Sequence, residues 1–81
     1  MDTEVWAAGP QTYEIRAVGG SDVVGRIQID ADPGQKATIE PVEGGALAGV
    51  EPGPYASRSA AMEIVGTYLR GNCDMGGQIQ H

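Results

Sequence analysis

Side chains that could do chemistry are few in this sequence, and they stand far apart. The single histidine, His81, is the last residue, and the single cysteine, Cys73, stands beside Asp74. A general base must be held within hydrogen-bond reach of its substrate, which a chain terminus rarely provides. A neighbouring carboxylate raises the pKa of a thiol, so Cys73 lacks the surroundings of an activated nucleophile. We therefore expect that the protein is not an enzyme.

Metal and cofactor sites are not expected either. One cysteine and one histidine cannot complete a zinc site, and the acidic residues lack the spacing of a calcium loop. The closest carboxylate pair is Asp30 and Asp32, which precedes a Pro-Gly turn. We interpret this pair as the polar end of a strand. The glycines of residues 44–49 have no following Lys-Ser/Thr pair, which a phosphate-binding loop needs. A helix start at Ser57 could attract a small anion, although a capped helix with an exposed arginine is the simpler interpretation.

The distribution of charge favours a protein partner over a nucleic acid. The 81 residues carry a net charge of −6, and the acidic surplus lies in residues 1–51. The five basic residues are scattered singly among acids, whereas binding to phosphates needs clustered Lys and Arg. The surplus of acids either supports solubility or attracts the basic surface of a partner.

The cysteine count and the hydropathy suggest a cytoplasmic protein. A single cysteine cannot form an intrachain disulfide, which small secreted domains commonly use. The sequence has no apolar run of membrane-spanning length. We therefore expect no contact with a membrane.

Three segments have the alternating pattern of half-buried strands, and turn residues separate them. In residues 13–17 the inward positions are Tyr13, Ile15 and Ala17. Residues 23–30 place Val23, Ile27 and Ile29 inward and Val24 outward. Residues 36–42 form the third strand, which Pro41 ends or confines to an edge. Residues 5–8 are a short strand or an arm, and residues 46–50 are a short strand or a loop anchored by Leu47 or Val50.

A helix is predicted over residues 57–70. Ser57 suits its N-cap, and Gly71 suits the left-handed position after its end. The apolar stripe that would cover the sheet consists of Ala60, Ala61, Ile64, Val65, Tyr68 and Leu69. The expected fold is α+β, with an antiparallel sheet of three to four strands and one C-terminal helix packed on one face. It forms a single domain over residues 1–71, and residues 72–81 are a flexible tail or contain a short strand through Gln78, Ile79 and Gln80.

Two segments resemble known small proteins. Tyr13-Glu14-Ile15, Val23-Val24-Gly25-Arg26 and Asp32-Pro33-Gly34 together resemble the amino-terminal hairpin of one family of small phage-encoded anti-CRISPR proteins. This resemblance implies a small acidic inhibitor that occupies a basic surface. Tyr55-Ala56-Ser57-Arg58-Ser59-Ala60-Ala61 resembles the helix start of uncharacterised small bacterial βββα proteins, which implies a fold and no function.

These observations predict a non-catalytic protein-binding module. We expect it to act as a phage or mobile-element inhibitor whose acidic surface meets a basic, nucleic-acid-handling partner. The alternative is a small self-associating protein, a homodimer formed through Trp6 or an uncovered edge strand. Trp6 itself either caps the core or marks a contact surface. The residues expected to bind a partner are Glu14, Asp30, Asp32, Glu40, Trp6 and Tyr55.

Overall fold

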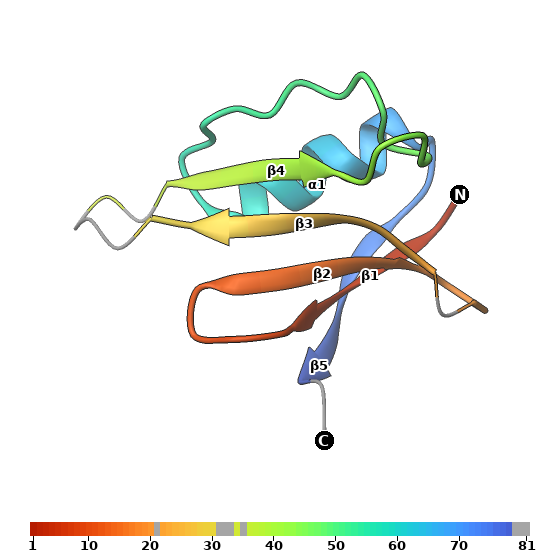
Figure 1. Ribbon diagram of the computed structural model, residues 1–81, viewed down its shortest axis with the longest axis horizontal. Helices are drawn as coiled ribbons and strands as arrows, with labels where there is room; N and C mark the ends of the chain where they lie inside the picture. The colour runs from red at the N-terminus through yellow and green to blue at the C-terminus, as the bar shows by residue number, and fades with distance from the viewer. Residues whose placement is uncertain (21, 31–33, 35, 79–81) are drawn as a thin grey trace.

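Five strands and one helix make up the part of the chain that the computed structural model describes, residues 1–20, 22–30, 34 and 36–78. The elements are β1 (Thr3–Ala7), β2 (Thr12–Ala17), β3 (Val23–Ile29), β4 (Ala37–Pro41), α1 (Arg58–Tyr68) and β5 (Cys73–Gln78). The strands form one sheet in the order β4-β3-β2-β1-β5, and α1 lies behind it in the view of Figure 1. No helix of this described part is long and apolar enough to cross a membrane.

The expected α+β class with one helix is confirmed, but the expected sheet is wrong in two details. It has five strands, and it is mixed, because β5 runs parallel to β1 while the other neighbours are antiparallel. The chain leaves β4 at one edge, passes through α1 and returns beside β1 at the other edge. Residues 73–78, expected as part of a tail, form β5; residues 79–81 lie outside the described part.

The first strand is an inner member of the sheet. Residues 5–8 were expected as a short strand or an arm, and the strand formed is β1, Thr3–Ala7, which pairs with β2 on one side and β5 on the other. Thr3 and Val5 are buried, while Glu4 and Trp6 alternate with them and are half-buried. Trp6 therefore belongs to a paired strand and not to an arm.

A bulge in β3 reverses two predicted orientations. Ile15 pairs with Gly25 and Arg16 pairs with Val23, so the register skips Val24. An extra residue in one strand shifts the alternation of side chains beyond it. Val24 is consequently 7 % exposed and belongs to the core, whereas Val23 is half-buried on the other face, opposite to the prediction.

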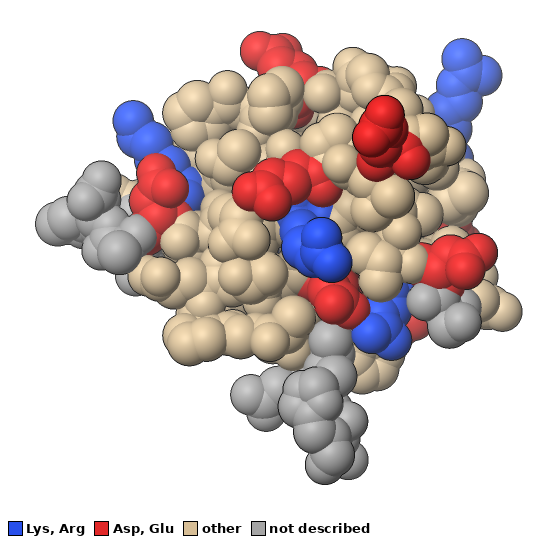
Figure 2. Space-filling view, in the orientation of Figure 1, with Lys and Arg blue, Asp and Glu red and all other residues tan. Residues whose placement is uncertain are grey.

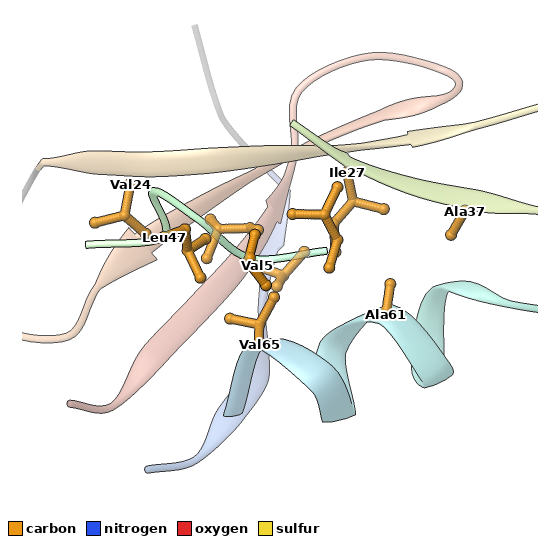
Figure 3. Packing of buried hydrophobic residues seen from close by; sticks show 10 residues of the cluster. Val5, Val24, Ile27, Ala37, Leu47, Ala61 and Val65 are labelled. Atoms are coloured by element: carbon orange, nitrogen blue, oxygen red, sulfur yellow. The ribbon is translucent and has the colours of Figure 1, made fainter. Parts of the chain in front are cut away.

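The core lies between the sheet and α1 (Figure 3). Its ten residues are Val5, Ile15, Val24, Ile27, Ala37, Ile39, Leu47, Val50, Ala61 and Val65. Two of them, Leu47 and Val50, come from the loop between β4 and α1, so the loop alternative for residues 46–50 is the one that the structure has. This loop completes a core for which the helix alone supplies only two residues.

The helix begins as predicted and is rotated relative to the predicted stripe. The Oγ of Ser57 accepts a hydrogen bond from the amide of Ala60 at 3.2 Å, which is the expected N-cap. The buried line is Ala61, Val65 and Gly66, and Ile64 and Tyr68 are 37 % and 44 % exposed. The helix packs against β3, β4 and β5. The row of buried helix residues that faces these strands is narrower than the apolar stripe that the sequence spacing predicts.

The two edges of the sheet differ. The outer side of β4 is covered by the segment before α1: Ala37 and Tyr55 exchange backbone hydrogen bonds at 2.9 and 2.7 Å, and the amide of Ile39 donates to the carbonyl of Pro52 at 2.9 Å. Among the described residues β5 pairs with β1 alone. The sheet thus has one covered edge and one open edge.

Candidate partner-binding face

The face of the sheet opposite α1 presents charged side chains from all five strands, and we call it the open face. Its charged residues and its one aromatic residue are Glu4 and Trp6 of β1, Glu14 and Arg16 of β2, Arg26 of β3, Glu40 of β4 and Asp74 of β5. They reach this face because they alternate with the buried residues of each strand. Figure 2 shows acidic and basic side chains interleaved over the strands.

One row of cross-strand neighbours runs through the middle of the open face. Glu40 is opposite Arg26, Arg26 is opposite Glu14, and Glu14 is opposite Trp6. Arg16 donates to the carboxylate of Glu14 at 2.8 Å, and their side chains are 32 % and 20 % exposed. Opposite charges at cross-strand positions contribute roughly 0.2–1 kcal/mol each. The centre of the face is thus nearly neutral, with alternating charges.

A second row concentrates negative charge at the β1–β5 end of the face. Glu4 lies between Arg16 of β2 and Asp74 of β5. Glu4 and Asp74 are like charges at directly paired positions, an arrangement that is unfavourable unless another group offsets it. With four acids and two bases in total, the open face carries its surplus of negative charge at this end.

The indole of Trp6 lies against β5 at Gly76. A Cβ placed on Gly76 would overlap the indole, with the ring's Cζ2 only 2.9 Å away. The register between β1 and β5 shifts at this point, so Val5 pairs with Met75 and Trp6 with Gly77. Glycine at position 76 leaves the space that the ring occupies. Trp6 therefore packs within the sheet's open face, neither on an arm nor in the core between the layers.

The structure brings together only some of the residues predicted to bind a partner. Glu14, Glu40 and Trp6 share the open face, and Asp30 is exposed beyond the end of β3, where its amide donates to the carbonyl of Lys36 at 2.9 Å. Asp32 lies outside the described residues.

Tyr55 lies away from the other predicted residues. It is half-buried against the core beside β4, and its hydroxyl donates to the carbonyl oxygen of Glu51 at 2.6 Å. Burial, and to a smaller extent the charge of Glu51, raise the pKa of this phenol. Tyr55 serves to hold the segment that covers the edge of β4.

Sequence reasoning missed Glu4 and Asp74 as members of the face. The alternation Thr3-Glu4-Val5-Trp6 was a usable signal for Glu4, because polar and apolar residues exchange at every position. Asp74 had no such signal, since the glycines beside it hid the strand. Both residues are placed by the pairing of β1 with β5.

The chemistry that the described residues support is limited. Burial raises the pKa of the Cys73 thiol; a hydrogen bond with Thr3 lowers it and the charge of Asp74 raises it further. This thiol is protonated at neutral pH and is a weak nucleophile. Within the described ranges no three His, Cys, Asp or Glu side chains gather in a way that could hold a metal ion.

Two of the hollows on the described surface lie beside α1. The larger, of about 550 Å³, lies between the second half of α1 and the start of β5. The smaller, of about 310 Å³, lies at the start of α1, where the guanidinium of Arg58 stacks 5.3 Å from the ring centre of Tyr13 and donates to its hydroxyl at 3.2 Å. Of these two, the larger hollow borders the open edge of the sheet.

A comparison with protein-family models, curated proteins and solved structures finds no significant match to this chain. The geometry described above is therefore the basis for a functional interpretation.

Proposed function

We propose that this chain is a non-catalytic protein-binding domain whose open face docks on the basic surface of a nucleic-acid-handling partner. The observation that carries the proposal is a sheet face free of helices, on which all five strands place charged residues, with four acids to two bases. Such a face suits an electrostatically complementary surface, which increases the rate of association and selects the partner.

The alternation of charge gives the proposed interface a register. Arg26 stands between Glu14 and Glu40, so a uniformly basic partner would meet a like charge at the centre of the face. A partner with an acidic or neutral position there, and basic positions around it, matches better. Specificity then comes from repulsion of the wrong pattern as well as attraction to the right one.

The proposal predicts that binding depends on the acids of the open face. Wild-type protein is used to capture a partner from host lysate, and the captured partner is purified. The double variant Glu4→Lys and Glu40→Lys should weaken its binding by at least about tenfold, because two complementary charges become repulsive. Glu14 is left unchanged, since its ion pair with Arg16 contributes to the fold.

The matched control is Glu43→Lys with Glu51→Lys, which makes the same change in net charge on the exposed loop outside the sheet. Affinity is measured by calorimetry at low and high salt, and competition with the partner's own nucleic acid tests the inhibitor interpretation. Equal loss of affinity in both double variants would show that only net charge matters. A homodimer that the Glu4 and Glu40 changes dissociate would mean that the face is a self-interface; either result overturns the proposal.

A further inference from the structure

We propose that the groove between α1 and β5 accepts an extended peptide segment of the partner, which adds to β5 as a sixth strand and carries an apolar–basic–apolar pattern. This inference rests on the proposed function and names its mode of docking. Strand addition at an open sheet edge is a recurring mode of peptide recognition, in which backbone hydrogen bonds supply affinity and alternate side chains supply specificity.

The backbone of β5 has groups free to pair on its outer side. The amide of Thr3 donates to the carbonyl of Asn72 at 2.8 Å, and the amide of Asn72 donates to the carboxylate of Asp2 at 3.0 Å, so the backbone of Asn72 faces β1. Successive residues of a strand direct their backbone groups to opposite sides. The N–H and C=O groups of Cys73 and Met75 therefore point outward, where no other described strand pairs with them.

A hollow beside this edge has room for side chains. It measures about 550 Å³ and its lining is mixed: Met62 and Gly66 of α1 lie beside the charged Glu63 and Arg70, and Cys73 and Asp74 belong to β5. Gly66 is buried, and a Cβ there would lie 3.0 Å from the carbonyl oxygen of Gly71, so the missing side chain lets α1 approach the turn into β5 closely. A strand added to β5 would direct alternate side chains into this space, as in domains that bind peptides between a strand and a helix.

The side chains around the edge define the peptide. A residue beside Asp74 would point to the open face, where the carboxylates of Asp74 and Glu4 are paired neighbours, so Lys or Arg fits there. The residues before and after it would point to the α1 side, beside the half-buried Cys73 and the Met75 side chain, which is 44 % exposed. Apolar side chains fit both of these positions.

The same charges argue against a second copy of this chain as the occupant. Two β5 strands paired about a twofold axis run antiparallel, which brings the Asp74 and Glu4 carboxylates of both copies along one seam. Each chain also has a net charge of −6. A cationic segment offsets this charge, whereas a second copy doubles it.

The test begins with a random peptide library displayed on phage and selected against the full chain. We expect selected peptides to share the apolar–basic–apolar pattern. The best synthetic peptide should lose affinity by at least about tenfold in Asp74→Lys, while the matched change Glu43→Lys, on the exposed loop outside the sheet, leaves it unchanged. Binding should also slow hydrogen exchange at the amides of Cys73 and Met75.

A second variant separates backbone pairing from charge. Met75→Pro removes an outward N–H and leaves the inward ladder to β1 intact, so it should abolish peptide binding while the fluorescence of Trp6 confirms the fold. Selected peptides without the pattern, or peptides that bind Asp74→Lys and Met75→Pro as tightly as the wild type, would overturn the inference. Chain dimers that Met75→Pro dissociates would identify a second copy as the occupant and also overturn it.

The purified partner distinguishes this failure from failure of the proposed function. If the partner loses affinity for the Glu4 and Glu40 double variant but binds Met75→Pro normally, the open face binds without an added strand. In that case the inference is wrong and the proposed function stands.

Discussion

Among the described residues, Arg70 is the one residue other than glycine with a positive φ, at 55°. It follows α1 at the position where the chain turns out of the helix, and the amide of Gly71 donates back to the carbonyl of Gly66 at 2.9 Å. This is the bond pattern in which a left-handed residue ends a helix, a place usually taken by glycine. The sequence predicted Gly71 for that role, one residue too late.

The reason for the difference is that Gly71 is needed for another contact. A Cβ at position 71 would overlap the carbonyl of Met1 and lie 2.7 Å from the Oδ1 of Asp2. The glycine permits the approach of the N-terminal strand, and Arg70 is left with the unfavourable backbone conformation. Only the packing of residues about 70 positions apart distinguishes these two uses of glycine.

We therefore expect Arg70→Gly to stabilise the fold by about 0.5–1 kcal/mol, because the left-handed conformation costs an L-residue about 1–2 kcal/mol and glycine returns part of that in chain entropy. Chemical denaturation measures the change. The control is Thr67→Gly, one turn earlier and exposed, which should destabilise the helix. A loss of stability in Arg70→Gly would show that the arginine side chain matters more than its backbone strain.

At the scale of elements, β5 shows why part of this fold could not be predicted from the sequence. Cys73–Gln78 contain two glycines and no β-branched residue, and such a composition is unfavourable for a strand. The strand exists because β1 offers a partner and because Gly76 makes room for Trp6. By contrast, the alternation in residues 13–17 predicted β2 correctly, since one of its faces is buried.

Gly76→Ala should therefore separate the two strands locally. The added methyl group overlaps the indole, so Trp6 must move into solvent and stability should fall by about 1–3 kcal/mol. The chain has one tryptophan, so a red shift of its fluorescence reports the displacement directly.

Gly9→Ala is the control for this change, because a Cβ there meets nothing within 4 Å and the φ of Gly9 is not positive. It should alter stability by no more than about 0.5 kcal/mol. An unchanged emission spectrum in Gly76→Ala would contradict the described packing of Trp6.

At the scale of the whole molecule, the sequence predicted a thin core covered on one face and could not identify what completes it. Leu47 is fully buried although it stands in a loop rich in glycine and proline. No periodic pattern marks such a residue, because its burial depends on where the loop crosses the sheet. For the open face, the alternation of β2 predicted Glu14, while the β1–β5 pairing that adds Glu4 and Asp74 depends on long-range contacts.

The stability of the molecule should decrease in alkaline solution. The pKa of Cys73 is raised above its usual value of 9.0, so the unfolded chain releases this proton at a lower pH than the folded one. The stabilisation is fully present below about pH 9 and is lost as the pH rises through the folded value.

Cys73→Ser removes this titration and should give a shallower decline above pH 9, measured by denaturation at a series of pH values. The slope that remains in the variant includes the contribution of Tyr55, whose pKa is also raised. Identical slopes in the two proteins would mean that the thiol is no more buried in the folded state than in the unfolded one.

The covered edge of β4 limits how this protein can assemble. Growth of a continuous sheet from molecule to molecule requires two edges, one that receives a strand and one that offers a strand to the next copy. Here residues 52–55 already occupy the outer side of β4, and within the described part of the chain β5 is the open edge. Pairing between copies through β5 would therefore stop at two molecules, so the protein can keep an exposed edge available without forming fibres.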